Sequence, residues 1–338
     1  MPETETLLRH VLRVGREPYG YFDEWAVHRL LTERPLEYLR FVKDELGEIA
    51  SGRAHLELPP KQIFPDPGEP SDFRVMPCVV RGRNGARKTV KLVGTNTRQE
   101  CVPNQITVGK AFVIDPAENF VSQVFEACLL SSARTGACAA IGLDLLAPSR
   151  GKLGVVGAGR VGYYAALYAA AQGGIESVTF WDRDRERARQ AAALLTRQLP
   201  TVRFVAASQS DELADVEVMV LATTSTFPVC DPDKVGAGLV VSLGADTDYQ
   251  SELDPAWAAV ADIFVDTRDC LRFGDLRAWR RAGLLRGDAP LDLFDLLRMG
   301  GPPASGRRRA FISTGSALFD NLTIGYLLQR ADKGPVKH

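Results

Sequence analysis

The sequence has few histidines, no closely paired cysteines and almost no net charge, and each of these absences excludes a class of protein. None of the four histidines has neighbours that suggest a metal site, so we expect no bound metal. The six cysteines are scattered without a Cys-x-x-Cys pair, which favours buried thiols in a reducing compartment over a disulfide framework. The formal net charge of −1 gives no reason to expect nucleic acid or an anionic membrane as a partner.

Long apolar runs are absent as well. No stretch reaches the ~18 consecutive apolar residues of a membrane span, and residues 1–6 lack the basic and then apolar layout of a secretory signal. The expected location is therefore the cytoplasm. The arginine-rich runs at 183–189 and 307–309 are predicted to be solvated faces or loops. With 338 residues, 45% of them hydrophobic, the chain is predicted to be globular, with room for two cores.

The most informative motif lies at residues 154–162. Gly157, Gly159 and Gly162 have the G-x-G-x-x-G spacing between a short apolar stretch and an alanine-rich helix candidate. The first glycine would allow a tight turn, the second would let the main chain approach a pyrophosphate, and the third would let the helix pack on the strand. The helix N-terminus would add unpaired N–H groups. The motif predicts a dinucleotide site.

The acid that the dinucleotide fingerprint requires is also present. The apolar stretch 177–181 ends in Asp182, about twenty residues after the last glycine, as the fingerprint expects. A carboxylate there would accept hydrogen bonds from a ribose and repel a 2′-phosphate, so NAD is the expected cofactor. Arg183 or Arg185 could hold that phosphate by turning inward, which leaves NADP possible.

The pattern of strands and helices predicts two domains. From residue 152 onward, strands alternate with helices, which is typical of a doubly wound parallel sheet. Its strands are expected at 153–157, 177–182, 202–206, 216–222, 238–243 and 262–266. Earlier strand-like runs predict an antiparallel sheet with helices packed on it, and an apolar helix at 313–329 is expected to return to it. Those runs lie at 73–80, 88–93, 111–114 and 120–125.

The predicted fold is therefore α/β. It consists of a Rossmann domain at residues 131–306 and a discontinuous α+β domain for substrate binding and dimerisation, at residues 1–130 and 307–338.

Three cationic side chains occupy positions that local rules disfavour. Lys91 lies within an apolar strand, and a helix expected at 131–146 would place Arg134 in its first turn, where a positive charge opposes the helix dipole. Arg74 lies on the preceding strand. Such conflicts are expected at functional sites, and three converging cations would bind a carboxylate. Alternatively, each cation pairs with a surface acid.

Asp246 directly follows a predicted strand of the parallel sheet. Ligands of open α/β sheets bind outside the carboxyl ends of the strands, so a partly dehydrated carboxylate here could exchange a proton with a substrate amine. A turn or helix-capping aspartate is the alternative, and position alone does not decide between the two.

Together these motifs resemble the ornithine cyclodeaminase and mu-crystallin family. The matching motifs occur in the same order as in the family and cover most of the chain. It rests on the motifs at Arg74, Lys91, Arg134 and the glycine-rich segment, and on residues 242–255, 265–266 and 313–320. It implies a homodimer built through the N-terminal sheets, NAD(P) on the central domain, and a small amino-acid or imino-acid substrate between the domains.

The resemblance also implies roles for individual residues. Asp246 and Lys91 would be catalytic, with Asp246 as proton donor and acceptor. Arg74, Lys91 and Arg134 would bind the substrate carboxylate. The implied cofactor contacts are Thr107, Arg134, Gly157, Gly159, Arg160, Val161, Gly162, Asp182, Arg183, Thr223, Thr224, Gly244 and Gly315.

The implied activity is that of an NAD-dependent oxidoreductase acting at the Cα–N bond of an amino or imino acid. Attack on the imine by a side-chain amine would make a cyclodeaminase, attack by water an amino-acid dehydrogenase, and the reverse reaction a ketimine reductase. The segments 94–103 and 247–250 differ from those of cyclodeaminases, while 126–132 is similar to siderophore-pathway members that act on an N-substituted amino acid. A dinucleotide-dependent binding protein, similar to mu-crystallin, is the alternative from another class.

Overall fold

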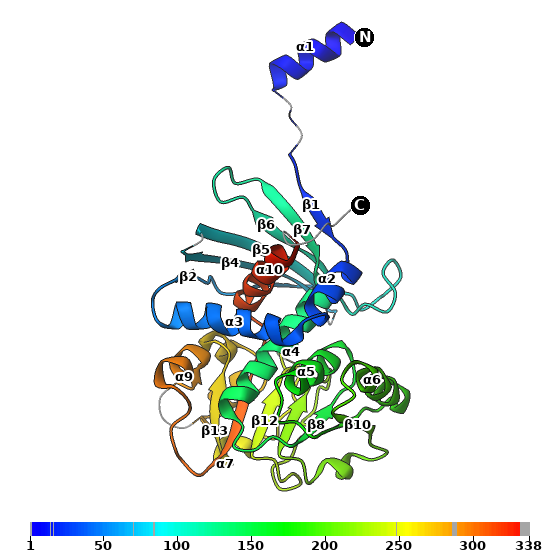
Figure 1. The fold of residues 1–338 in the computed structure, drawn as a ribbon, viewed down its shortest axis with the longest axis vertical. Helices are drawn as coiled ribbons and strands as arrows, with labels where there is room; N and C mark the ends of the chain where they lie inside the picture. The colour runs from blue at the N-terminus through cyan, green and yellow to red at the C-terminus, as the bar shows by residue number, and fades with distance from the viewer. Residues whose placement is uncertain are drawn as a thin grey trace.

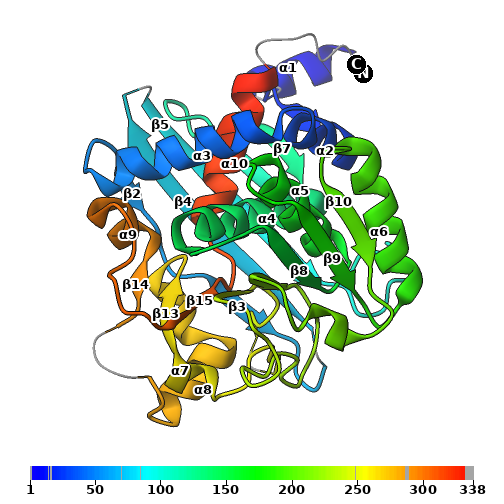
Figure 2. The same cartoon turned by 60° about the horizontal axis from the view of Figure 1, so that its bottom comes forward.

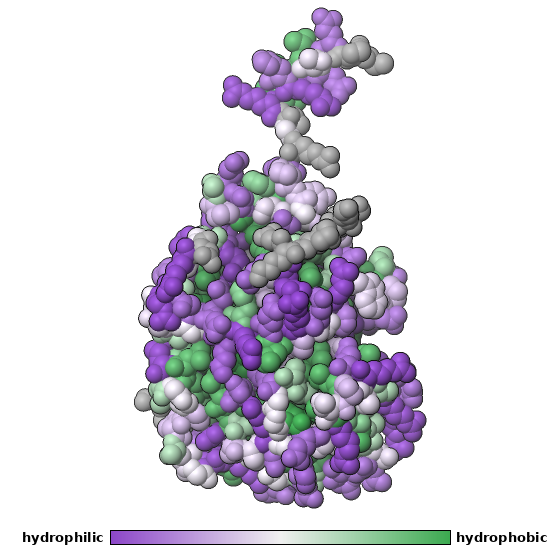
Figure 3. All heavy atoms as spheres, in the orientation of Figure 1, coloured by the Kyte–Doolittle hydropathy of each residue, from purple (hydrophilic) through white to green (hydrophobic). Residues whose placement is uncertain are grey.

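The computed structural model describes residues 2–331 except residues 14, 16, 70, 84, 248 and 286–288. These residues form two lobes, each built around one β-sheet (Figure 1). Helix α4 (Ala127–Leu146) runs from the first lobe to the second, and α10 (Ala317–Ala331) returns to the first. The short helix α1 (Pro2–Leu12) stands apart from both lobes, and its apolar side chains lie exposed among polar ones (Figure 3).

The first lobe contains a seven-stranded mixed sheet in the order β1-β7-β6-β5-β4-β2, with β3 paired to β4. Its strands are β1 (Gly20–Phe22), β2 (His55–Glu57), β3 (Gln62–Pro65), β4 (Asp72–Gly82), β5 (Gly85–Thr95), β6 (Thr107–Ile114) and β7 (Val121–Glu126). The predicted antiparallel arrangement is confirmed for β4 to β7. Strand β1, which pairs in parallel with β7, was not predicted.

One face of this sheet is covered by helices. The helices α2 (Glu24–Thr32), α4 and α10 pack on it, and α3 (Pro35–Ala50) packs on α10. Because side chains alternate along a strand, Met76, Cys78 and Val80 of β4 point into this core and are buried, while Phe73 and Leu92 on the opposite face are exposed. The first lobe therefore has one buried face and one open face.

The second lobe contains an eight-stranded sheet that is parallel throughout, in the order β10-β9-β8-β11-β12-β15-β13-β14. Its strands are β8 (Lys152–Val156), β9 (Ser177–Trp181), β10 (Arg203–Ala206), β11 (Val218–Leu221), β12 (Leu239–Ser242), β13 (Ala261–Val265), β14 (Leu291–Asp292) and β15 (Arg308–Ile312). The six predicted strands are β8 to β13, which confirms the doubly wound α/β fold.

Helices cover both faces of the parallel sheet. Val218 and Val220 of β11 face a core shared with α4, α5 (Arg160–Ala171) and α6 (Arg185–Gln198), whereas Met219 and Leu221 face a second, smaller core. Figure 2 shows β8 to β10 side by side, with α5 and α6 beside them. The remaining helices are α7 (Trp257–Val260), α8 (Gly274–Arg281), α9 (Leu293–Met299) and the 3₁₀ turns η1 (Ser210–Leu213) and η2 (Arg268–Arg272).

Strand β15 corrects the domain boundary expected at residue 307. It lies between β12 and β13 in the parallel sheet, where the sequence predicted a solvated arginine-rich run. The arginines satisfy main-chain carbonyls instead: Arg308 donates to Pro232 O and Arg309 to Leu146 O. We infer a boundary after Ile312, which keeps the sheet whole. The C-terminal segment is described only to residue 331.

Helix α4 is the central core helix. It is long and apolar enough to span a membrane, but 78% of its apolar window is buried within the protein. A Cβ at Gly136 would lie 2.7 Å from the main chain of α5, and one at Gly142 would lie 2.5 Å from the ring of Phe311. The small residues of α4 therefore allow neighbouring elements to approach closely.

Candidate active site

The glycine-rich segment joins β8 to α5. Gly157 has a φ of 95°, and a Cβ there would lie 2.4 Å from the carbonyl oxygen of Ala222. A Cβ at Gly162 would lie 2.0 Å from the carbonyl oxygen of Gly157. Gly159 caps α5 without a side-chain hydrogen bond, and nothing lies within 4 Å of its would-be Cβ. The loop leaves open space before the unpaired N–H groups of α5, which suits a phosphate.

Asp182 follows β9 and lies beside this loop. Its Oδ2 accepts a hydrogen bond from the main-chain N–H of Ala158 at 2.8 Å, and its Oδ1 accepts one from that of Asp184 at 2.8 Å. The carboxylate thus holds the loop, while each oxygen keeps a further lone pair for a ligand hydroxyl. The contact with a ribose stays a prediction, and Arg183 is exposed.

A buried glutamate that was not predicted, Glu252, ties together the loops after β11 and β12. Its carboxylate accepts hydrogen bonds from the N–H and hydroxyl of Thr223 at 2.7 and 2.9 Å, and from the N–H of Gly244 at 2.8 Å. A Cβ at Gly244 would lie 2.1 Å from the carbonyl oxygen of Thr223, so the close contact requires glycine. Both loops lie at the carboxyl edge of the sheet, where ligands bind.

Three cations share the helix-covered face of the first-lobe sheet. Arg74 pairs with Ile63, two residues beyond Lys61, and Met76 pairs with Lys91. Because alternate residues point the same way, Lys61, Arg74 and Lys91 lie on one side of the sheet. Lys91 contacts α10 there, whereas Lys61 and Arg74 contact the second lobe. Lys91 is 2% exposed and Lys61 is 6% exposed. Lys61 was missed because it lies outside any strand pattern, directly after two prolines.

Asp320 of α10, also missed, is the counter-ion of two predicted cations. Its Oδ1 accepts hydrogen bonds from Lys91 Nζ at 2.8 Å and from Arg134 Nε at 3.0 Å. Burial lowers the pKa of Lys91 to about 7, although Asp320 opposes the shift. The alternative of a surface acid is wrong for these two cations, since Asp320 is 2% exposed. Two buried cations sharing one carboxylate leave positive charge for an anionic ligand.

Arg134 lies well inside α4, not in its first turn. The predicted helix start at residue 131 is wrong because α4 continues directly from β7 and begins at Ala127. The argument from the helix dipole therefore does not apply to Arg134. Gly315, with a φ of 77°, makes room for its guanidinium: a Cβ there would lie 2.8 Å from Nη1.

Asp246 and Arg74 form an ion pair between the two lobes. Arg74 Nη1 lies 2.5 Å from Asp246 Oδ2, while Arg74 Nε and Nη2 donate to Asp72 at 2.7 and 3.0 Å. The side chain of Asp246 is 33% exposed. Burial raises the pKa of Asp246, but Arg74 and Lys61 outweigh this effect and hold it below its usual value. The carboxylate is thus ionised and accessible at neutral pH.

The other predicted contacts are spread around the same region. Thr107 begins β6, and Arg160, the first residue of α5, donates to Asn104 O at 3.1 Å across the two lobes. Val161 follows in α5, and Thr224 is exposed after β11.

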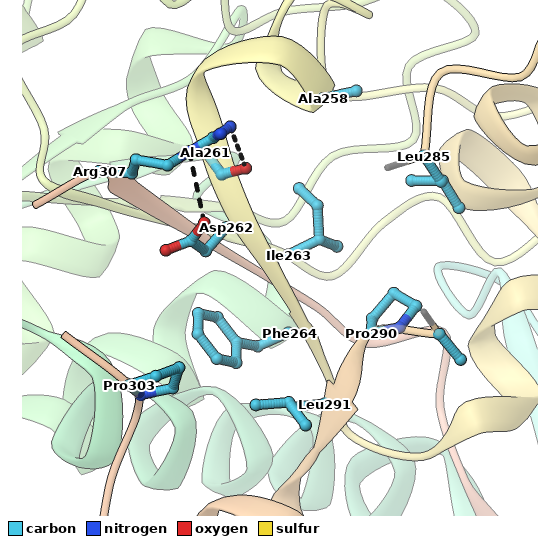
Figure 4. A pocket seen from close by; sticks show the side chains of 11 residues that line it. Ala258, Ala261, Asp262, Ile263, Phe264, Leu285, Pro290, Leu291, Pro303 and Arg307 are labelled. Atoms are coloured by element: carbon cyan, nitrogen blue, oxygen red, sulfur yellow. Dashed lines mark hydrogen bonds and ion pairs between the residues drawn. The ribbon is translucent and has the colours of Figure 1, made fainter. Parts of the chain in front are cut away.

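A separate pocket lies at the opposite edge of the parallel sheet. Figure 4 shows it at the start of β13, beside the ion pair of Asp262 and Arg307, and it encloses about 250 Å³. None of the predicted site residues lines it. Among the residues that the structure describes, no three His, Cys, Asp or Glu side chains gather as a metal site would require.

Known proteins share both sequence and fold with this chain. The matched region of iminosuccinate reductase from Paracoccus denitrificans is 32% identical over 197 residues, 57% of this chain and 60% of that protein. L-lysine cyclodeaminase from Streptomyces rapamycinicus is 27% identical over 314 residues, 87% of each chain. The match to the first of these relatives thus spans less than two thirds of its length.

Solved structures match almost the whole chain. The Δ1-pyrroline-2-carboxylate reductase of Thermococcus litoralis, in complex with NADH and L-proline, has a TM-score of 0.82 at 18% identity, covering 93% of this chain and 97% of that one. The Paracoccus iminosuccinate reductase with NAD⁺ has a TM-score of 0.79 at 23% identity, covering 94% and 97%. These likenesses show the fold. The family model for the ornithine cyclodeaminase/mu-crystallin family matches residues 27–288, and the chain belongs to this family.

Proposed function

We propose that the protein is an NAD-dependent oxidoreductase acting at the Cα–N bond of an amino acid or imino acid bound between its lobes. The observation that carries the proposal is the Asp246–Arg74 ion pair, which joins an accessible carboxylate of one lobe to the cations of the other. Relatives named as iminosuccinate reductase and L-lysine cyclodeaminase support it. Assaying purified protein with NAD and a panel of amino acids, by NADH absorbance and product mass, tests it.

The residues around the glycine-rich loop fit a dinucleotide. The open space at Gly159 and the free N–H groups of α5 would receive its pyrophosphate. Asp182 would accept hydrogen bonds from a ribose, and the loops at Thr223 and Gly244 would lie beside the nicotinamide end. When bound, the cofactor supplies the hydride acceptor, or the donor in its reduced form.

The substrate would be held by the buried cations and deprotonated by Asp246. Lys91 and Arg134 hold its carboxylate, using the positive charge that Asp320 leaves uncompensated. Asp246 takes a proton from the substrate ammonium group, and the resulting amine loses hydride from Cα to give a protonated imine. In the reverse direction Asp246 returns the proton to nitrogen. Arg74 keeps Asp246 ionised and in position.

A homodimer through the open face of the first-lobe sheet fits the same proposal. That face carries exposed aromatic and aliphatic side chains, and Phe64 and Phe73 stack on it at 4.6 Å between ring centroids. Exposed apolar area of this kind marks contact surfaces. Sedimentation equilibrium of the purified protein tests this part.

NAD(H) is expected to bind roughly tenfold more tightly than NADP(H), because a 2′-phosphate would lie against the Asp182 carboxylate. Asp182→Asn should reduce this preference while preserving the overall shape of the loop. Nicotinamide fluorescence titration measures both affinities, and Asp184→Asn, at the exposed N-cap of α6, is the control. Tighter binding of NADPH than of NADH by the unaltered protein would refute the role of Asp182.

Lys91→Met is expected to raise the KM for the substrate by about 10- to 150-fold, since a hydrogen bond to a charged group contributes about 1.5–3 kcal/mol. The dissociation constant for NAD should change little, because Lys91 lies in the other lobe. With the pKa of Lys91 at about 7, wild-type kcat/KM should fall as the pH rises through this value, and the variant should lose that limb. Lys88→Met, at a half-buried site on the same strand, serves as control. An unchanged KM in Lys91→Met would exclude Lys91 from the site.

A further inference from the structure

The charged side chains between the lobes are not all paired. Four cations, Lys61, Arg74, Lys91 and Arg134, face three carboxylates, Asp72, Asp246 and Asp320. The three carboxylates pair with Arg74, Lys91 and Arg134, whereas Lys61 forms no ion pair with a described residue. A further acid, Asp266, does not pair with Lys61 either: its oxygens accept hydrogen bonds from Ser313 and Thr267, and burial raises its pKa.

Of these four cations, Lys61 is the one that forms no ion pair with a described residue. Its Nζ donates to the carbonyl oxygen of Thr314 at 2.9 Å and lies 4.1 Å from the centroid of the Phe273 ring. An ammonium group has three donors, so two remain for a ligand. Burial lowers the pKa of Lys61, with Asp246 opposing the shift. An anion bound beside Lys61 would remove the cost of burying its charge.

Resting on the function proposed above, we propose that the substrate carries a second carboxylate in its side chain, which Lys61 and Arg74 bind while Lys91 and Arg134 bind the first. The two pairs occupy different parts of one face. Arg74 belongs to β4, and Lys61 directly precedes β3. Lys91 and Arg134 both donate to Asp320 of α10. Asp72 accepts two hydrogen bonds from Arg74 and so orients its guanidinium group.

The net charge of the substrate then decides which amino acid fits. At neutral pH a diamino acid carries one net positive charge, an amino acid with a neutral side chain carries none, and an acidic amino acid carries one net negative charge. Only the acidic class supplies one carboxylate to Lys91 and Arg134 and a second one to Lys61, which has no ion pair. A diamino acid would bring a second buried charge of the same sign, which is strongly unfavourable where water is excluded.

The surface next to Lys61 extends this positive charge outward. A groove of about 600 Å³ adjoins Phe273, the ring over which Lys61 lies, and it is lined by Leu271, Phe273, Arg272, Arg277, Arg280 and Arg281. The guanidinium carbon of Arg272 is 5.4 Å from the centroid of the same ring. A cationic approach of this kind raises the local concentration and the association rate of an anionic ligand.

The wild-type protein tests the charge argument with isosteric pairs. In the presence of NAD, we expect kcat/KM to be at least about tenfold higher for L-aspartate than for L-asparagine, or for L-glutamate than for L-glutamine. This factor is the loss in kcat/KM expected when an amide replaces the carboxylate and one charge-assisted hydrogen bond is lost. L-ornithine and L-2,4-diaminobutyrate should be poorer than either amide. Equal rates for acid and amide, or a preference for the diamino acids, would overturn the second carboxylate but leave the proposed function standing.

Binding without turnover provides an independent measurement. Succinate should raise the unfolding temperature more than its monoamide succinamate does at equal concentration, because a ligand stabilises the state that it binds. If no amino acid is turned over, the proposed function fails, and this comparison still decides whether the site takes two carboxylates. Identical shifts for the two ligands would contradict it.

Lys61→Met then tests the residue assignment. The ratio of kcat/KM for acid over amide should fall by about tenfold, with the KM for NAD unchanged, and Lys61→Arg should restore most of the preference. Lys234→Met, whose side chain is 80% exposed on the other lobe, is the matched control. An unchanged ratio in a folded Lys61→Met protein would remove Lys61 from the site. If Lys61→Met does not fold, the thermal shifts of Lys61→Arg decide instead. Equal shifts of its unfolding temperature with succinate and succinamate would remove Lys61 from the site.

Discussion

Asp246→Asn is expected to lower turnover by about 10²- to 10⁴-fold, the contribution typical of a general acid or base. The asparagine keeps the shape of the side chain, and its carbonyl oxygen can still accept a hydrogen bond from Arg74, 2.5 Å away in the unaltered protein. It cannot take a proton from the substrate nitrogen. Because neither NAD nor a carboxylate ligand needs that proton, both should bind with nearly unchanged affinity.

Asp72→Asn is the matched control for this experiment. Asp72 also pairs with Arg74, but it lies 9% exposed behind the guanidinium, so its replacement weakens the same arginine without removing the base. Its turnover should fall far less than that of Asp246→Asn at similar thermal stability. Two other outcomes are informative. Near-wild-type activity in Asp246→Asn would make Asp246 a turn residue, and absence of turnover in the unaltered protein with every amino and imino acid would favour a binding protein.

Local sequence patterns were sufficient to predict the glycine-rich loop and six of the eight strands of the parallel sheet. The glycines at 157 and 162 are needed because their neighbours in space, Ala222 O and Gly157 O, leave no room for a Cβ. That need appears in the sequence as a fixed spacing followed by a helix. The buried strands of the parallel sheet likewise appear as short apolar runs. The prediction of α4 from residue 131 was less accurate, since no glycine or proline separates it from β7.

Partners distant in the sequence could not be predicted in this way. Lys91 was suspected because a lysine among apolar neighbours is costly, but its counter-ion, Asp320, is 229 residues away and looks like an ordinary first-turn acid of a helix. Lys61 and Glu252 have no periodic pattern around them, and their functions arise only when loops meet. The arginines of β15 were predicted to be solvated for the same reason, because the carbonyl groups that accept their hydrogen bonds belong to remote segments.

The electrostatic design of the site depends on these distant partners. Asp246 is ionised because an arginine from the other lobe lies against it, and Asp320 opposes the effect of burial on Lys91, whose pKa is lowered to about 7. Neither group would have these properties in its own segment. The candidate site is therefore a property of the assembled lobes, which explains why sequence motifs indicated its members but not their charge states.

Asp320→Asn is expected to have the largest effect on stability, about 3–5 kcal/mol less free energy of unfolding, as when one partner of a buried ion pair is removed. The side chain is 2% exposed, and its loss leaves Lys91 and Arg134 buried side by side without an anion. Asp144→Asn is the control, since its carboxylate, 25% exposed, also pairs with two cations, Lys43 and Arg150. That replacement should cost about 1 kcal/mol or less. Urea unfolding followed by circular dichroism measures both.

A carboxylate ligand should partly rescue Asp320→Asn. If Lys91 and Arg134 bind the substrate carboxylate, a bound dicarboxylate such as succinate replaces the missing negative charge, so it should raise the unfolding temperature of the variant more than that of the wild type. Acetamide, which lacks the charge, should rescue neither protein. A purely structural ion pair predicts a destabilised variant in which succinate has no larger effect than in the wild type. That outcome would separate Lys91 and Arg134 from substrate binding, even if Asp246→Asn abolished turnover.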